Sequence, residues 1–141
     1  MKKKLLGLAL LGAMMATLLV GCGSSGGKKG DTKDDVITIG FSQVGAESDW
    51  RTANSESMKS TFTKDNGYEL IFDDAQQKQE NQLTAIRNFI QQEVDYILLA
   101  PVTETGWDTV LQEAKDADIP VIIVDRMVDV SDDSLYTTWI G

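Results

Sequence analysis

The chain alternates short apolar runs with amphipathic stretches, and the spacing of the runs fits a series of strand–helix units. The runs begin at residues 36, 68, 94 and 121, so successive runs start 32, 26 and 27 residues apart. Each gap has room for one helix, which is the size of a βαβ unit. Residues 121–124 are four consecutive Val and Ile residues, typical of a strand that is buried on both faces. The pattern therefore predicts an α/β fold, a doubly wound parallel sheet with helices on both faces.

The same patterns predict five strands and three helices. The strands are expected at residues 36–42, 68–72, 94–100, 121–124 and 135–140, and the helices at 50–64, 79–92 and 105–117. Ser48 or Asp49 can cap the first helix, and Thr105 with Asp108 resembles a capping box for the third. Trp107 stands at helical spacing with the apolar residues that follow it, so we expect it in the core.

The first 21 residues are expected to be a targeting segment. Three lysines at positions 2–4 precede an almost wholly apolar run at 5–20, as in a secretory signal peptide. The run ends at Leu-Val-Gly-Cys, residues 19–22, which resembles the lipobox of bacterial lipoproteins. The resemblance implies cleavage before Cys22 and lipidation of its thiol, and the alternative is a plain signal anchor with an incidental cysteine. Residues 22–35 are rich in Gly, Ser and charge, so a flexible linker is expected before a domain at 36–141.

Charge and composition exclude several classes of function. The chain carries a net charge of −9, and without the three lysines of the leader it has 10 basic and 22 acidic residues. Such an acidic surface argues against a nucleic-acid partner. Histidine is absent, which removes the commonest general base and metal ligand, and the single cysteine excludes an intrachain disulfide. We therefore expect neither a cofactor nor a metal site.

An enzyme is the least favoured class. The sequence has no Gly-x-Ser-x-Gly elbow and no histidine for a catalytic triad. The acidic pair Asp73 and Asp74 suggests a phosphoacceptor receiver domain, but it follows the second predicted strand instead of the first. Ala100 and Pro101 follow the third strand, where a receiver domain needs an aspartate.

Four stretches carry a resemblance to a known family. They are GFSQVGAESDWR (40–51), DDAQQKQENQLTAIRNFI (73–90), VDYILLAPVTETGW (94–107) and IPVIIVDR (119–126). In this order and spacing they resemble the periplasmic sugar-binding proteins of ABC importers, in the ribose- and galactose-binding group and nearest to its galactofuranose-binding members. The resemblance implies a type I periplasmic-binding fold, in which two lobes close on a monosaccharide that is then delivered to a membrane permease.

The resemblance also implies which part of such a protein is present and where it works. Residues 36–141 correspond to part of the N-terminal lobe, so we expect the chain to be a fragment of a two-lobed protein. The expected location is the extracytoplasmic face of the bacterial membrane or the periplasm. The alternative function is a sugar-sensing lipoprotein that presents its ligand to a membrane sensor kinase.

The candidate ligand residues follow the predicted strands, where open parallel sheets bind their ligands. Asp125 and Arg126 match the Asp-Arg pair that binds sugar hydroxyls in the family; a carboxylate accepts from hydroxyls and a guanidinium donates to them. The resemblance also implies ligand contacts from Trp50, whose indole can stack on a sugar, and from Arg51. Simpler interpretations are a surface ion pair for Asp125 and Arg126, and a core anchor for Trp50.

Weaker candidates come from the end of the first strand and the loop after it. Ser42 and Glu47 are expected to offer a hydroxyl and a carboxylate to the sugar, and Gln43 is a less favoured third. Asp73 and Asp74 end the second strand, but helix capping alone would explain one of them.

Overall fold

Five parallel strands form a single sheet in the computed structural model, which describes residues 36–141. The strands are β1 (Ile37–Gln43), β2 (Tyr68–Asp74), β3 (Tyr96–Leu99), β4 (Val121–Val124) and β5 (Thr138–Ile140), in the spatial order β2-β1-β3-β4-β5. Every neighbouring pair is parallel. The predicted parallel α/β sheet is therefore confirmed. The predicted leader, Cys22 and the linker at 22–35 lie outside the described residues.

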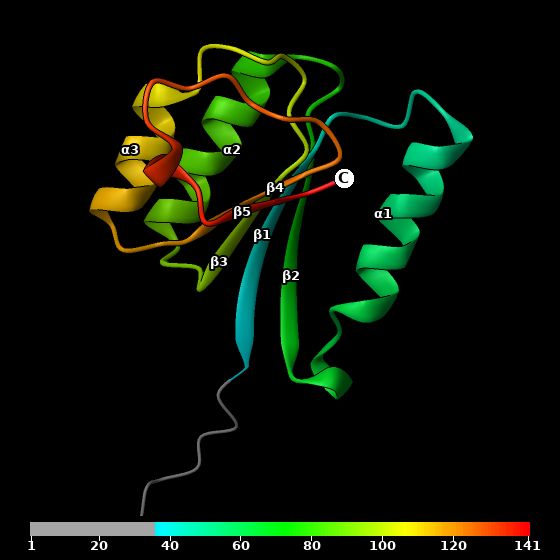
Figure 1. The fold of residues 1–141 in the computed structure, drawn as a ribbon. Helices are drawn as coiled ribbons and strands as arrows, with labels where there is room; N and C mark the ends of the chain where they lie inside the picture. Colours follow the sequence, from blue (N-terminus) through cyan, green and yellow to red (C-terminus); the bar gives the residue numbers. More distant parts are fainter. Residues whose placement is uncertain (1–35) are drawn as a thin grey trace, which may run out of the picture. The chain divides into compact units, whose positions relative to one another are not determined.

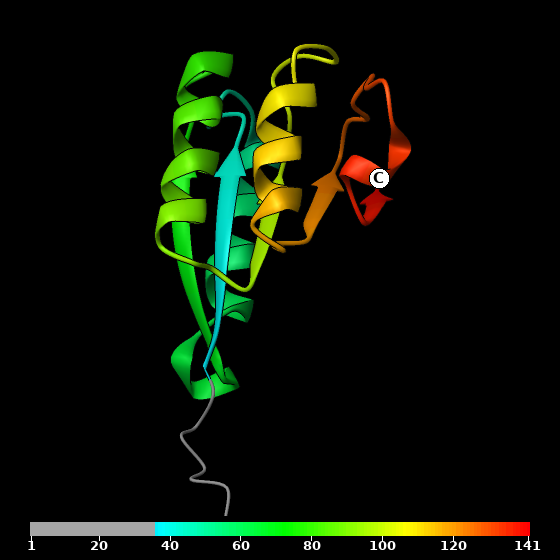
Figure 2. The ribbon, with the colours of Figure 1, turned by 90° about the vertical axis from the view of Figure 1, so that its left-hand side faces the viewer.

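Helices cover both faces of the sheet, as the doubly wound prediction requires. They are α1 (Asp49–Thr61), α2 (Gln79–Gln91) and α3 (Asp108–Asp116), with short 3-10 turns at Lys64–Asn66 and Asp133–Leu135. Helices α2 and α3 lie side by side on one face, and α1 lies on the other (Figures 1 and 2). Between residues 36 and 141, no helix has the length and apolar character needed to cross a bilayer.

One helix cap agrees with the prediction, whereas another helix cap and the start of the last strand differ from it. Ser48 caps α1 as expected, because its Oγ accepts from the backbone N–H of Arg51 at 3.2 Å. The capping box predicted for the third helix is wrong: α3 begins at Asp108, and the Asp108 carboxylate accepts from the backbone N–H of Ser131 at 2.8 Å. The last strand begins at Thr138 instead of 135, because the chain first forms the 3-10 turn.

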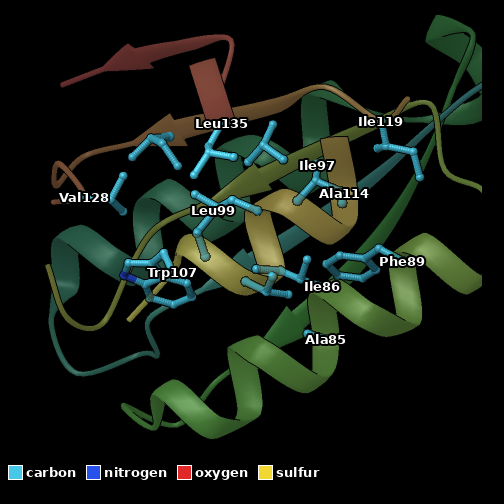
Figure 3. Packing of buried hydrophobic residues seen from close by; sticks show 14 of the residues in the cluster. Ala85, Ile86, Phe89, Ile97, Leu99, Trp107, Ala114, Ile119, Val128 and Leu135 are labelled. Atoms are coloured by element: carbon cyan, nitrogen blue, oxygen red, sulfur yellow. The ribbon is translucent and has the colours of Figure 1, made fainter. Parts of the chain in front are cut away.

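The core has one apolar layer on each face of the sheet. The larger layer lies between the sheet and helices α2 and α3, and it includes the fully buried Trp107, Ile86 and Leu111 (Figure 3). The placement of Trp107 in the core is thus confirmed. The smaller layer includes Phe41 of β1, and Met58 of α1 packs against it. The two layers fix the sheet between its helices and hold the carboxyl ends of β1 and β4 next to α1.

Candidate functional site

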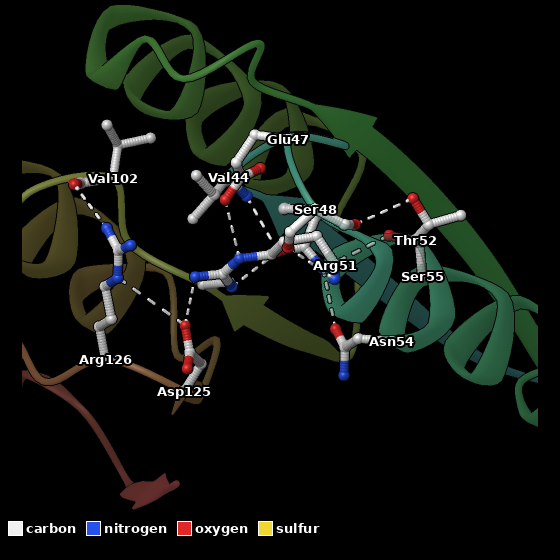
Figure 4. A network of polar contacts seen from close by, with 12 residues as sticks. Val44, Glu47, Ser48, Arg51, Thr52, Asn54, Ser55, Val102, Asp125 and Arg126 are labelled. Atoms are coloured by element: carbon white, nitrogen blue, oxygen red, sulfur yellow. Dashed lines mark hydrogen bonds and ion pairs between the residues drawn. The ribbon is translucent and has the colours of Figure 1, made fainter.

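The carboxyl edge of the sheet gathers four charged residues from two loops. Glu47 and Arg51 come from the segment between β1 and α1 and from the first turn of α1, and Asp125 and Arg126 directly follow β4 (Figure 4). Parallel strands bring these loops together although they are more than 70 residues apart in sequence, since the hydrogen bond between Arg51 and Asp125 spans 74 residues. The loop after β1 and the turn after β4 therefore meet at the carboxyl edge of the sheet, as predicted.

Arg51 is the centre of this cluster. Its Nε donates to Glu47 Oε1 at 3.1 Å, its Nη1 donates to Gln43 Oε1 at 3.3 Å, and its Nη2 donates to Asp125 Oδ2. The Arg51 side chain is only 5% exposed, whereas those of Glu47 and Asp125 are 26% and 29% exposed. The guanidinium therefore lies beneath the two carboxylates and orients them, and it offers little surface of its own.

Asp125 is held in an unusual backbone conformation. Its φ is +70°, a left-handed value that costs most residues energy and that Asp adopts more readily than most. The backbone N–H of Asp125 donates to the carbonyl of Ile140 at 2.8 Å, and its own carbonyl accepts from Trp139 Nε1 at 3.3 Å. These bonds tie the turn after β4 to β5, and the turn directs the carboxylate toward α1.

Arg126 is the exposed cation of the cluster. Its side chain is 51% exposed, its Nε lies 3.9 Å from Asp125 Oδ2, and its Nη1 donates to the carbonyl of Val102 at 3.4 Å. These are long contacts at a solvated surface, so they contribute little to stability. The guanidinium of Arg126 is thus available to a ligand in a way that the buried Arg51 is not.

Trp50 covers a pocket beside Asp125. Its side chain is 55% exposed, which excludes the core-anchor interpretation, and Arg51 Cζ lies 5.1 Å from the centre of its ring. The pocket has a volume of about 260 Å³. It is lined by Trp50, Asn54, Met58, Val124, Asp125, Ile140 and Gly141. An aromatic ring, apolar side chains and one carboxylate are groups that can bind a monosaccharide.

A sequence model of a periplasmic binding protein domain matches residues 39–138. The chain belongs to this family. It is 56% identical to the galactofuranose-binding protein YtfQ of Escherichia coli over 102 residues, which are 72% of this chain and 32% of that protein. Such family members are solute-binding proteins of the periplasm, not enzymes.

Two solved structures resemble the domain closely. One is a Mycobacterium smegmatis protein in complex with β-D-fucofuranose, with 58% identity, a TM-score of 0.72, and coverage of 74% of this chain and 34% of that one. The other is the binding protein of the arabinose ABC transporter from Shewanella sp. ANA-3, bound to α- and β-L-arabinofuranose. It shows 58% identity, a TM-score of 0.71, and coverage of 74% and 35%. The chain thus spans about a third of the length of these relatives.

Ser42 is a predicted ligand residue that the structure does not bring to the cluster. It pairs in register with Leu99, which belongs to the apolar layer under α2 and α3, so its side chain lies on that face. Ser42 is completely buried, and its Oγ has no hydrogen-bond partner within residues 36–141. A ligand beside Asp125 on the α1 face does not reach it, because side chains alternate between the two faces of a strand and Ser42 is buried on the other face.

Gln43 was predicted as a less favoured ligand residue, but it contacts the centre of the cluster. It follows Ser42, lies on the α1 face and contacts Arg51 directly. The alternation along β1 could have found it, since Phe41, two residues earlier, packs in the layer on the α1 side. Polarity alone does not reveal this position, because a glutamine at the end of a strand is more often exposed.

Asp73 lies beside Ser42 on the α2 face, outside the cluster. Burial raises the pKa of its carboxyl group, and the neighbouring charge of Asp74 raises it further. The binding domain has no group of three or more acidic, His or Cys side chains that could hold a metal ion between residues 36 and 141.

Proposed function

We propose that residues 36–141 form the N-terminal half of a sugar site in a solute-binding protein of an ABC importer. The ligand is a monosaccharide, and a furanose such as galactofuranose fits best. The observation that carries the proposal is the Asp125 carboxylate, fixed by Arg51 at the rim of a pocket that Trp50 covers. Three similar proteins whose names or complexes involve furanoses support the choice of ligand.

Each exposed group of the site has one task in this proposal. Asp125 uses Oδ2 for Arg51, so its other oxygen accepts from a sugar hydroxyl. Trp50 has Arg51 over its ring and stacks its remaining face on the C–H face of the sugar. Arg126 and Glu47 lie at the rim and bind further hydroxyls, Arg126 as a donor and Glu47 as an acceptor. The second lobe of the family supplies the other contacts.

The proposal includes delivery of the sugar to a membrane permease and attachment to the membrane. Attachment is supported by the lipobox-like residues 19–22 and by a linker with no apolar residue at 23–35. The protein then acts on the extracytoplasmic side of the cell membrane, in agreement with the periplasmic location of the family.

The proposal is tested by sugar binding to the full chain, expressed with its leader and purified in detergent. Saturation-transfer NMR detects millimolar binding, and L-arabinose and D-galactose are the probes because both populate furanose forms in solution. We expect saturation of sugar protons in the parent chain. Asp125→Ala should weaken binding by about 2–4 kcal/mol, since it removes the acceptor for the sugar hydroxyl and leaves Arg51 with one carboxylate partner instead of two. Trp50→Ala should weaken binding by about 1–3 kcal/mol through lost stacking.

Ser42→Ala is the matched control, because it removes a polar group at the same edge of the sheet but on the other face. Binding in this variant should equal that of the parent chain. Parent-like binding in a folded Asp125→Ala chain would remove Asp125 from the site. Absence of any sugar signal from the parent would contradict the proposal for this half of the site.

A further inference from the structure

Gln43 is completely buried, contacts the site directly and has no part in the sugar chemistry described above. It is the last residue of β1, and its side chain points toward α1. We propose that Gln43 is a positioning residue: it fixes the Arg51 guanidinium, and Arg51 in turn presets the Asp125 carboxylate for the ligand. The inference rests on the proposed sugar site only in its last step, from Asp125 to the ligand.

The contacts of Gln43 use all the hydrogen-bonding capacity of its amide. Its Oε1 accepts from Arg51 Nη1 at 3.3 Å and from the backbone N–H of Val44 at 3.0 Å. Its Nε2 donates to Asn54 Oδ1 at 2.8 Å and to Ser55 Oγ at 3.4 Å. Because a guanidinium and a backbone N–H can only donate, the amide oxygen must face Arg51. The orientation of Gln43 is thus determined by its partners.

The charge balance explains why a neutral amide suits this position. Two carboxylates, those of Glu47 and Asp125, already bond to Arg51, and Arg126 lies 3.9 Å from Asp125. The four side chains together carry no net charge. A third carboxylate in place of Gln43 would be buried without a cation to match it, which is costly. Gln43 supplies a third acceptor to Arg51 and adds no charge.

Gln43 is also the only one of the three acceptors of Arg51 that is wholly buried. Glu47 and Asp125 are partly exposed and belong to loop segments, so they can move with the guanidinium. Gln43 instead belongs to a strand and is joined through Asn54 and Ser55 to α1. Without Gln43, Arg51 and Asp125 would remain paired, but the guanidinium would lose its bond to strand β1. A loosely held carboxylate binds its ligand more weakly, because ordering it costs free energy on binding.

The test measures how firmly Arg51 is held, first without any sugar. In the ¹⁵N-labelled full chain, the Arg51 Nε–H resonance is identified by its absence from the Arg51→Lys variant. We expect hydrogen exchange of this N–H to be about tenfold faster in Gln43→Leu, the loss that corresponds to one hydrogen bond to a charged group. Asn54→Ala removes only the acceptor that orients Gln43, and it should accelerate exchange about threefold, as for a lost neutral hydrogen bond.

Gln82→Leu is the matched control, since it removes the other completely buried glutamine, on the α2 face of the same sheet. It should lower stability and leave the exchange of Arg51 Nε–H within about twofold of the parent, because the two sites share no partner. Parent-like exchange in folded Gln43→Leu, or equal acceleration in Gln43→Leu and Gln82→Leu, would overturn the inference. If Gln43→Leu does not fold, Asn54→Ala decides by the same measure.

Binding of L-arabinose then connects Gln43 to the ligand. We expect about tenfold weaker binding in Gln43→Leu and less than about twofold weakening in Gln82→Leu, again the ratio for one charge-assisted bond. Unchanged binding together with faster exchange would overturn the step from Asp125 to the ligand. If the parent chain binds no sugar, the proposed function fails, and the exchange experiment still decides whether Gln43 positions Arg51.

Discussion

Two completely buried glutamines stand on opposite faces of the sheet at its carboxyl edge. Gln43 serves Arg51 on the α1 face, while Gln82 donates to the carbonyl of Ala100 at 2.7 Å and accepts from the N–H of Val102 at 2.8 Å on the other. Each satisfies buried groups without adding a buried charge. Alternation along β1 could place Gln43 on the α1 face, but sequence patterns could not predict the bonds of either glutamine, because their partners come from other segments.

The partly buried carboxyl group of Asp73 makes the stability of the fold depend on pH. The folded chain binds the Asp73 proton more tightly than the unfolded chain, because burial raises the pKa above its usual value of 3.8. The stability that comes from the protonated form is therefore complete below pH 3.8 and is lost as the pH rises through the raised pKa. Asp73→Asn stays neutral throughout, so we expect a higher Tm than the parent at pH 7 and an equal Tm at about pH 3.

Thermal unfolding followed by circular dichroism at pH 3, 5 and 7 measures this difference. Asp74→Asn is the control, because it removes the neighbouring charge and leaves the Asp73 carboxylate in place. Its gain at pH 7 should be smaller than that of Asp73→Asn, since burial is the larger cause of the shift. A Tm for Asp73→Asn below that of the parent at pH 7 would contradict the expected sign.

Strand β1 and helix α2 approach each other closely at Gly40. A Cβ added at Gly40 would lie 2.4 Å from Cγ of Phe89, which is closer than any real contact. Gly40→Ala should therefore cost about 1–3 kcal/mol of unfolding free energy by overpacking. This exceeds the roughly 0.5–1 kcal/mol that alanine gains over glycine from reduced backbone entropy. Urea denaturation measures the change.

The double variant Gly40→Ala with Phe89→Leu separates steric conflict from a general intolerance of change in β1. The smaller leucine makes room for the new methyl group, so the double variant should lose less stability than the sum of the two single variants, by about 0.5 kcal/mol or more. Strict additivity would mean that Phe89 does not cause the loss. Gly67→Ala cannot serve as a control for this steric effect. Gly67 has a φ of +83°, so alanine there would destabilise the chain through backbone strain.

Helix caps were predictable from the sequence where the capping bond joins residues close together in the chain. The Ser48 cap is local, with its bond partner three residues along the chain, and it is found as expected. The expected cap of the third helix failed because Asp108 bonds to Ser131, 23 residues away, which no local pattern reveals. The positions of Asp125 and Arg51 followed from the strand ends, but the burial of Arg51 depended on three partners from three segments.

The proposed sugar site and the start of β1 lie at opposite edges of the sheet. Ile37 begins β1 at the amino edge, and Gln43 ends it at the carboxyl edge with the site. Seven residues of strand span about 20 Å. If Cys22 carries a lipid, as proposed, this attachment is joined to the domain through the start of β1. The attachment would therefore join the domain at the amino edge of the sheet, and the proposed sugar site lies at the carboxyl edge.

Lipidation of Cys22 can be tested directly by metabolic labelling. When the full chain is expressed in a bacterium fed radiolabelled palmitate, it should become labelled and remain in the membrane fraction, because more than one acyl chain gives stable anchoring. Cys22→Ala should lose the label completely, and Ser24→Ala, two residues away, should keep it. The alternative of a plain signal anchor predicts no label in any of the three chains and an uncleaved leader on an electrophoresis gel. Equal labelling of Cys22→Ala and the parent would show that the lipid is not on Cys22.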